Sequence, residues 1–241
     1  MTIIARNWDN SVTMRRAVTA INSAEIQLWL ATVGPDERVT ALESSLTPQE
    51  LARASRLSVH YPRQEFVTGR ATLRQILGAF LNVEPVAVGL AASTHGKPCL
   101  AGEHRPSSLQ FNLSHSRGRV MIALARGREV GVDLEWMHGV DDWNLLADRV
   151  LSSRELAELR GLPLAQQREA FYNGWTRKEA WLKATGEGLM NDLSAIEVTI
   201  APGRPPEWLG LPGGAAAMRR WTVREVPLTE GFAGAVVYEN I

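Results

Sequence analysis

The segment 171–183, FYNGWTRKEAWLK, constrains the fold most strongly, because its pattern predicts one helix with adjacent apolar and charged faces. Its apolar residues recur at helical spacing: Phe171, Trp175 and Leu182. Glu179 and Lys183 lie one turn apart beside that stripe. Such a pair stabilises a helix by roughly 0.2–0.5 kcal/mol, so taken alone it also fits a solvent-exposed surface. The neighbouring tryptophans and Lys178 favour a site that handles phosphate.

The composition is that of a globular protein without excess charge. The 241 residues are 45% hydrophobic and include 26 basic and 26 acidic side chains, which suits one large domain or two small ones. A nucleic-acid partner normally requires a basic excess, so we expect none, and any anion site must be local. The single cysteine, Cys99, excludes an internal disulfide and a cysteine-rich metal site, which fits a reducing compartment.

Nothing in the sequence predicts insertion into a membrane. No apolar run approaches 18 residues, and residues 1–23 lack the apolar core of a signal peptide. We therefore expect a cytoplasmic protein without a membrane partner, whose residues 1–23 form a loose N-terminal arm.

The rest of the chain divides into two similar halves. Capping boxes at Thr47–Glu50 and Ser152–Glu155 each predict the start of a helix. A longer helix is expected over residues 62–80. Strands are predicted over residues 25–30, 111–116, 120–125, 129–135, 196–200, 221–226 and 233–238. We predict an α+β fold of two pseudo-duplicated lobes, residues 24–127 and 128–241, each a small antiparallel sheet packed with helices.

Two carboxylates share one face of the predicted strand 129–135, which we expect to form a hairpin with residues 120–125. Asp133 and Glu135 are two residues apart, so their side chains lie about 6.5–7 Å from each other on that face. This spacing lets both reach one Mg²⁺ ion, which typically takes one or two carboxylates together with phosphate oxygens. The alternative is the ordinary polar face of a half-exposed strand.

Two further motifs suit anion binding. Lys97 stands between a glycine and a proline in a tight turn, where it has little conformational freedom left to lose, although an exposed turn lysine fits equally. Ser114 and His115 end a strand. Neighbouring strand residues point to opposite faces, so these two do not pair as the nucleophile and base of a hydrolase. The sequence also lacks a Gly-x-Ser-x-Gly elbow, and we expect the pair to hold phosphate.

Taken together, these motifs form an ordered set. In chain order they are the basic helices, Gly96–Pro98, Phe111–Ser116, Gly131–Glu135 and Trp175–Lys183. The set resembles the Sfp-type 4′-phosphopantetheinyl transferases, a two-lobed monomeric class, from about Glu25 to the C-terminus. The stretches 46–53, 65–70 and 183–188 are most similar to the cyanobacterial branch associated with heterocyst glycolipids.

The resemblance implies a reaction and a set of site residues. The phosphopantetheine arm of coenzyme A would move to a serine of an apo acyl or peptidyl carrier protein, releasing adenosine 3′,5′-bisphosphate. The implied Mg²⁺ ligands are Asp133, Glu135 and Glu179, and the implied catalytic residues are Glu179, Lys183 and Asp133. Either Glu179 or a metal-bound water would take the serine proton. The implied coenzyme A ligands are Arg53, Arg63, Arg70, Lys97, Ser114, His115, Lys178 and Lys183.

The resemblance also implies a docking face and leaves alternatives open. The carrier protein, which is acidic, would dock on residues 150–167 and nearby side chains (Arg149, Leu151, Arg154, Leu159 and Arg160). Glu50 stands where some members of the family place a lysine for the 3′-phosphate, so the arginines must bind that group. The competing hypotheses are a non-catalytic regulator that binds coenzyme A or a carrier protein, and a metallohydrolase acting on nucleotides.

Overall fold

The chain folds into two compact units. The computed structural model describes residues 1–8, 21–93, 96–104, 107–138, 142–186 and 192–241. The first unit comprises Met1–Ser93 and Pro98–Gly127, and the second comprises Thr94–Lys97 and Arg128–Ile241. The change of unit after Gly127 coincides with the predicted lobe boundary, but Lys97, which we expected in the first lobe, is part of the second unit.

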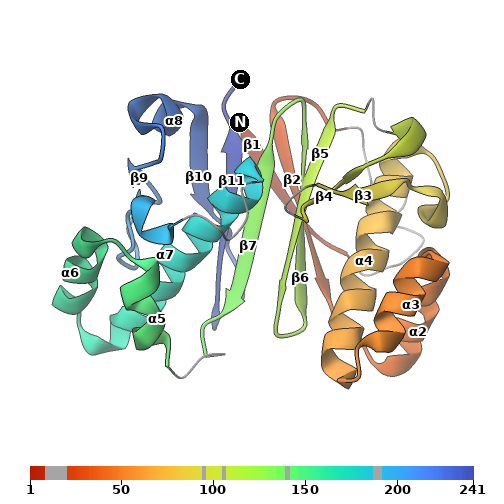
Figure 1. Cartoon of the computed structure of the whole chain (residues 1–241), viewed down its shortest axis with the longest axis horizontal. Coiled ribbons are helices and arrows are strands. Elements are labelled where there is room, and N and C mark those ends of the chain that lie inside the picture. The colour runs from red at the N-terminus through yellow and green to blue at the C-terminus, as the bar shows by residue number, and fades with distance from the viewer. Residues whose placement is uncertain (9–20, 94–95, 105–106, 139–141, 187–191) are drawn as a thin grey trace. The chain divides into compact units, whose positions relative to one another are not determined.

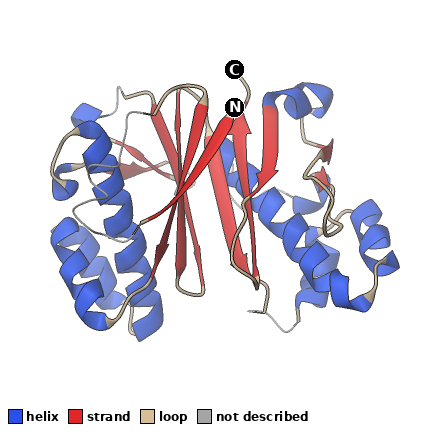
Figure 2. Cartoon of the chain, turned by 180° about the vertical axis from the view of Figure 1, so that it is seen from behind, coloured by secondary structure: helices blue, strands red, loops and turns tan. Residues whose placement is uncertain are grey.

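A four-stranded sheet forms the first unit (Figures 1 and 2). Its strands, in spatial order, are β1 (Thr2–Asn7), β2 (Glu25–Thr32), β6 (Arg119–Arg126) and β5 (Leu109–Ser116). The helices are α2 (Asp36–Leu42), α3 (Pro48–Arg56) and α4 (His60–Leu81), and a separate short hairpin consists of β3 (Leu90–Ala92) and β4 (Pro98–Leu100). Apolar residues of α4 pack on one sheet face in a core that includes Trp29, Leu73, Ile76, Phe111 and Ile122.

A three-stranded antiparallel sheet forms the centre of the second unit. Its order is β10 (Trp221–Glu225), β11 (Phe232–Glu239) and β7 (Val130–Trp136). The long helix α7 (Leu164–Thr185) contacts β7 and β11. The remaining elements are α5 (Trp143–Val150), α6 (Ser153–Gly161), β8 (Glu197–Val198), β9 (Trp208–Gly210) and α8 (Gly214–Arg220).

The structure confirms an α+β fold with a shared plan in both halves. Each unit packs one helix of 22 residues against antiparallel strands, α4 in the first unit and α7 in the second. Both helices end at a residue in the left-handed conformation, Asn82 with φ 57° and Gly186 with φ 73°. Both predicted capping boxes are present. The Thr47 and Ser152 hydroxyls accept from the backbone amides of Glu50 and Glu155, and the carboxylates of these glutamates accept from the backbone amides of the two cap residues.

Two predictions about the sheets are wrong. Residues 129–135 do not form a hairpin with 120–125, because both edges of β6 are occupied by β2 and β5, while β7 pairs with β11. The N-terminal arm is not loose where it is described, since Thr2–Asn7 pair in parallel with β2 and Trp8 is buried against Trp29. Residues 9–20 of the predicted arm lie outside the described part of the chain. Among the described residues, no helix is long and apolar enough to cross a bilayer.

Candidate active site

The predicted catalytic strand and helix are packed together through a glycine. Gly131 lies on the same face of β7 as Asp133 and Glu135, because alternate strand residues share a face. A Cβ atom added to Gly131 would lie 2.1 Å from the Ala180 carbonyl oxygen and 2.3 Å from the Ala184 nitrogen. The β7 backbone therefore touches the backbone of α7 directly, and a glycine inside a strand marks such a close approach.

This packing brings two predicted site residues into contact. The Nζ of Lys183 donates to Asp133 Oδ1 over 2.6 Å. The Asp133 side chain is 3% exposed and the Lys183 side chain is 30% exposed, so a buried carboxylate is paired with a partly exposed lysine. A charge-assisted hydrogen bond at this depth fixes both groups more firmly than an exposed surface pair would.

Glu179 is also buried, and its pKa is far from the usual value of a glutamate. Burial, then the charge of Asp133 and to a smaller extent that of Glu135, raise the pKa of Glu179 to about 7, while Lys183 acts in the opposite direction. The three predicted carboxylates and Lys183 therefore interact electrostatically within the second unit. Such perturbed groups concentrate at functional sites.

The donor set is compatible with a hard cation. Within the described residues, no group of three or more histidine, cysteine, aspartate or glutamate side chains is arranged as a preformed metal centre. The buried Oε1 of Glu179 nevertheless has no hydrogen-bond partner, and it faces the repulsion of two other carboxylates. A Mg²⁺ ion bound here would give this buried oxygen a partner and would reduce the repulsion among the carboxylates.

Lys178, which the family resemblance implies to be a coenzyme A ligand, is held inside the second unit by structural contacts. Its side chain is fully buried, and Nζ donates to Glu155 Oε2, the Val150 carbonyl and the Leu193 carbonyl. These three bonds use all the donors of an ammonium group. Burial lowers the pKa of Lys178, although the neighbouring Glu155 opposes this effect.

Lys97 forms hydrogen bonds to both the start of β7 and the end of α7. Its Nζ lies 2.9 Å from Glu129 Oε2 and donates to the Val130 and Ala184 carbonyls at 3.2 Å and 3.1 Å. The Ala184 carbonyl belongs to the last turn of α7, where a cation also complements the helix dipole. Lys97 therefore has a structural function whether or not it also contacts an anion.

Three predicted coenzyme A ligands line one cavity in the first unit. Arg53, Arg70 and His115 surround a space of about 150 Å³, together with Glu65 and apolar side chains of α4 and β5. Arg53 stacks on the Phe66 ring at 5.0 Å, and Arg70 lies 3.4 Å from Glu50. Burial lowers the pKa of Arg70. Two arginines therefore give this otherwise largely apolar cavity a positive charge, which an anion site requires.

Two other predicted ligands lie elsewhere. Arg63 is paired with Glu43 at 2.5 Å and is not among the residues that line the cavity. Ser114 is buried, whereas the side chain of its neighbour His115 is 46% exposed, as expected for adjacent strand residues.

The sequence arguments missed two supporting residues. Gly131 could have been noticed, because a glycine between two valines of a predicted strand indicates close backbone contact. Glu155 was recognised only as a helix cap, yet it also accepts from Lys178 and from the Val198 amide. Its second function depends on residues far along the chain and left no local signal.

The groups described so far suit an enzyme that acts on a phosphate-containing substrate. They are buried carboxylates and a lysine in the second unit and a cavity with two arginines in the first. Comparison with known proteins identifies the family. Residues 129–237 match the 4′-phosphopantetheinyl transferase superfamily, and residues 34–126 match the N-terminal domain of 4′-phosphopantetheinyl transferase. The chain belongs to the 4′-phosphopantetheinyl transferase family and is a transferase.

The most similar relatives support this assignment along most of the chain. The 4′-phosphopantetheinyl transferase HetI of a Nostoc species is 36% identical over 89% of this chain and 87% of its own length. The putative 4′-phosphopantetheinyl transferase slr0495 of Synechocystis is 33% identical over 70% of this chain and 68% of its own length. The predicted resemblance to the cyanobacterial branch is thereby confirmed. AcpT of Escherichia coli is 36% identical over 52% of this chain and 58% of its own.

Proposed function

We propose that the protein transfers the phosphopantetheine arm of coenzyme A to a serine of an apo carrier protein and releases adenosine 3′,5′-bisphosphate. The contact between Lys183 and Asp133, beside a Glu179 whose pKa is raised to about 7, carries this proposal. Transfer of a phosphoryl-type group needs positioning and charge neutralisation more than covalent chemistry from the protein. The family assignment supports the same reaction.

The reaction needs one bond to form and one to break. The serine oxygen attacks the phosphorus that carries pantetheine, and the bond from that phosphorus to the bridging pyrophosphate oxygen breaks. The serine proton passes to Glu179, the buried carboxylate that interacts with Asp133 and Lys183 in the same site. Lys183 neutralises the charge that develops on the leaving bisphosphate, since its Nζ is held at the site by Asp133.

Mg²⁺ is part of the proposal. Asp133, Glu135 and Glu179 would hold it, and it would neutralise pyrophosphate oxygens when bound. The unpartnered Oε1 of Glu179 and the mutual repulsion of the acids support this choice.

The cationic cavity of the first unit is the proposed binding site for the adenosine 3′-phosphate. Arg53 and Arg70 provide its positive charge, and His115 adds an imidazole that can bind the phosphate. Glu50, which replaces an expected lysine, accepts from Thr47 and pairs with Arg70 and Arg74. The glutamate therefore holds one of the cavity's arginines in place, although it contributes no positive charge itself.

The docking face for the carrier protein needs a revision. Leu151 and Leu159 belong to the hydrophobic core, so they are not available to a partner. The exposed apolar residues of this region are Leu145 on α5 and Leu164 at the start of α7, at 64% and 85% exposure. Arg149 and Arg154 are exposed on the adjacent α5 and α6.

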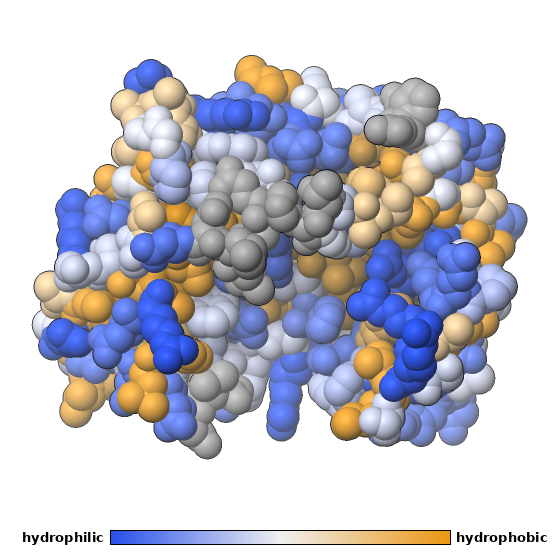
Figure 3. All heavy atoms as spheres, viewed as in Figure 1, coloured by the Kyte–Doolittle hydropathy of each residue, from blue (hydrophilic) through white to orange (hydrophobic). Residues whose placement is uncertain are grey.

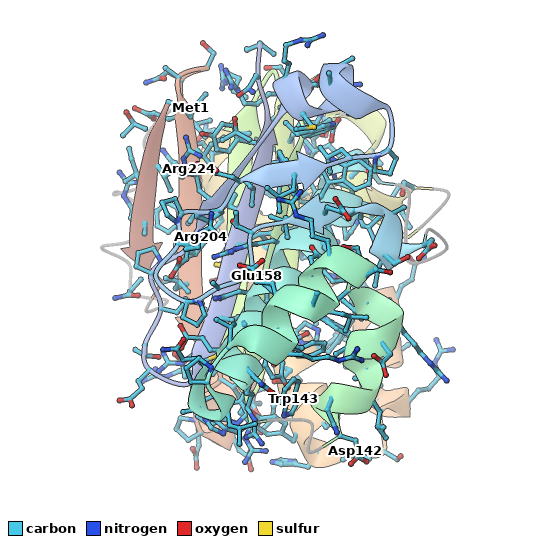
Figure 4. The ribbon with its side chains drawn as sticks, turned by 90° about the vertical axis from the view of Figure 1, so that its left-hand side faces the viewer. Met1, Asp142, Trp143, Glu158, Arg204 and Arg224 are labelled. Carbon is cyan, nitrogen blue, oxygen red and sulfur yellow. The ribbon has the colours of Figure 1, made fainter. Side chains whose placement is uncertain are left out.

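Apolar and hydrophilic side chains are mixed on the face over α5 and α6 in Figure 3, and Figure 4 shows the start of α5 at Trp143. We propose that this mixed surface binds an acidic carrier protein, by apolar contact at the leucines and charge attraction at the arginines.

A mass-gain assay tests the proposal. The protein is incubated with coenzyme A, Mg²⁺ and a panel of apo carrier proteins, and a gain of one phosphopantetheine arm is measured by mass spectrometry. Asp133→Asn and Glu179→Gln should abolish the gain, whereas Glu37→Gln, which removes an exposed carboxylate from α2 of the first unit, should not. Tight coenzyme A binding without transfer would favour a regulator, and bisphosphate release without a carrier would favour a hydrolase.

A further inference from the structure

The cationic cavity of the first unit contains one carboxylate that needs an explanation. Glu65 lines the cavity beside Arg53, Arg70 and His115, and the residue is only 9% exposed. A negative charge placed in an anion site repels the ligand. Its presence there therefore requires a compensating function.

The hairpin between β5 and β6 fixes the position of this carboxylate. The Gly118 amide donates to Glu65 Oε1 over 2.6 Å. Arg117 and Gly118 form a two-residue turn in which both have positive φ, 47° and 73°, between the paired residues Ser116 and Arg119. Since one carboxylate oxygen is held by the turn, the other has a defined direction.

The second carboxylate oxygen lies next to His115. Glu65 Oε2 is 3.7 Å from His115 Nδ1, which is within ion-pair distance. A carboxylate at this distance attracts the near edge of the imidazole and so favours one ring orientation, which leaves the other nitrogen for a ligand. The His115 side chain is 46% exposed.

We propose that Glu65 is a positioning residue that holds the His115 imidazole with Nε2 toward the 3′-phosphate of coenzyme A. This role rests on the function proposed above. Glu65 does not contact the phosphate, and it favours coenzyme A over 3′-dephospho-coenzyme A only through the imidazole that it orients. The repulsion that the carboxylate exerts on the phosphate is offset by the fixed orientation that it gives to the imidazole.

Glu65→Gln separates the two functions of the side chain. Glutamine keeps an acceptor for the Gly118 amide, but it loses the charge that faces His115. We expect the KM for coenzyme A to rise about three- to fivefold, the ratio that corresponds to a partly exposed ion pair. The kcat and the KM for 3′-dephospho-coenzyme A should stay at wild-type values. Glu37→Gln, which removes an exposed carboxylate from α2 of the same unit, is the matched control.

A double-mutant cycle tests whether Glu65 acts through the histidine. In a His115→Gln background, Glu65→Gln should cause no further rise in the KM for coenzyme A, because coupled residues are not additive. An equal rise in that background would overturn the proposal. So would an equal response of both substrates, which would indicate a function in the turn alone. A lower KM for coenzyme A would show that the carboxylate only repels the phosphate.

Calorimetric titration of the wild-type protein separates this proposal from the function on which it rests. Absence of coenzyme A binding would refute the proposed function and the role of Glu65 with it. Coenzyme A binding that Glu65→Gln leaves unchanged, with the same preference over 3′-dephospho-coenzyme A, would refute only the role of Glu65.

Discussion

Replacing Gly131 with alanine should damage the active site without touching any charged group. The added Cβ would lie 2.1 Å from the Ala180 carbonyl oxygen, 1.3 Å short of the 3.4 Å at which ordinary contacts begin. Backbone atoms have no rotamer to change, so β7 or α7 must shift by about that distance. Glu179 and Lys183 adjoin the two clashing alanines, and the shift therefore separates them from Asp133.

Both stability and turnover should respond. Overpacking of this kind costs about 1–3 kcal/mol, and a domain of this size loses about 2–4 °C in Tm per kcal/mol. A displacement of about 1 Å at reacting groups lowers the rate about 100-fold. Transfer is measured by the mass-gain assay with saturating coenzyme A, and Tm is measured by calorimetry.

Gly210→Ala is the matched control for this prediction. A Cβ at Gly210, the last residue of β9, would lie 3.5 Å from Glu197 Oε2, which is an ordinary contact distance. Its rate should match the wild type and its Tm should not fall. If Gly131→Ala kept both wild-type values, the close contact between β7 and α7 would not exist. If only Tm fell, the distance between strand and helix would not govern the chemistry.

For three other changes, the structure gives the expected direction and size of the effect on the free energy of unfolding. The pKa of Glu179 is raised from 4.5 to about 7, so the folded chain binds more protons than the unfolded chain between these values. The free energy of unfolding without metal should then fall by up to about 3 kcal/mol as pH rises through this window, and denaturant titrations of Glu179→Gln should lack this slope. Lys178→Met leaves the Glu155 carboxylate buried without its cation and should cost about 3–5 kcal/mol in the same titrations, and a loss below 1 kcal/mol would contradict the buried pair. Thr47→Ala removes the cap of α3 and should cost about 0.5–2 kcal/mol, whereas unchanged unfolding would show that the cap is not stabilising.

The features predicted correctly from the sequence are those that depend on local chemistry. The capping box at Thr47 was recognisable because all its partners lie within four residues. Asp133 was placed on one strand face with Glu135 because the strand period is two. Its contact with Lys183 was not predicted, because the family resemblance implied only that both residues belong to the site.

The wrong predictions concern partners that are distant in sequence. The pairing of β7 with β11 rather than β6 depends on which sheet edges are free, and no local pattern records this. The short β1 was missed because its pairing with β2 is parallel and its residues are polar in part. The structural contacts of Lys178 were not predicted, because the groups that bury it come from α5, α6 and the segment before β8.

Lys97 determines how the protein can be divided. The chain leaves the first unit after Ser93, contributes Lys97 to the second unit, and returns at Pro98. A fragment that begins at Arg128 would contain every predicted acid of the site, yet the last turn of α7 would lack the ammonium that bonds to the Ala184 carbonyl. A single proteolytic cut at Gly127 therefore does not yield two complete halves, and exchange of lobes between relatives requires moving the residue-97 turn together with the C-terminal half.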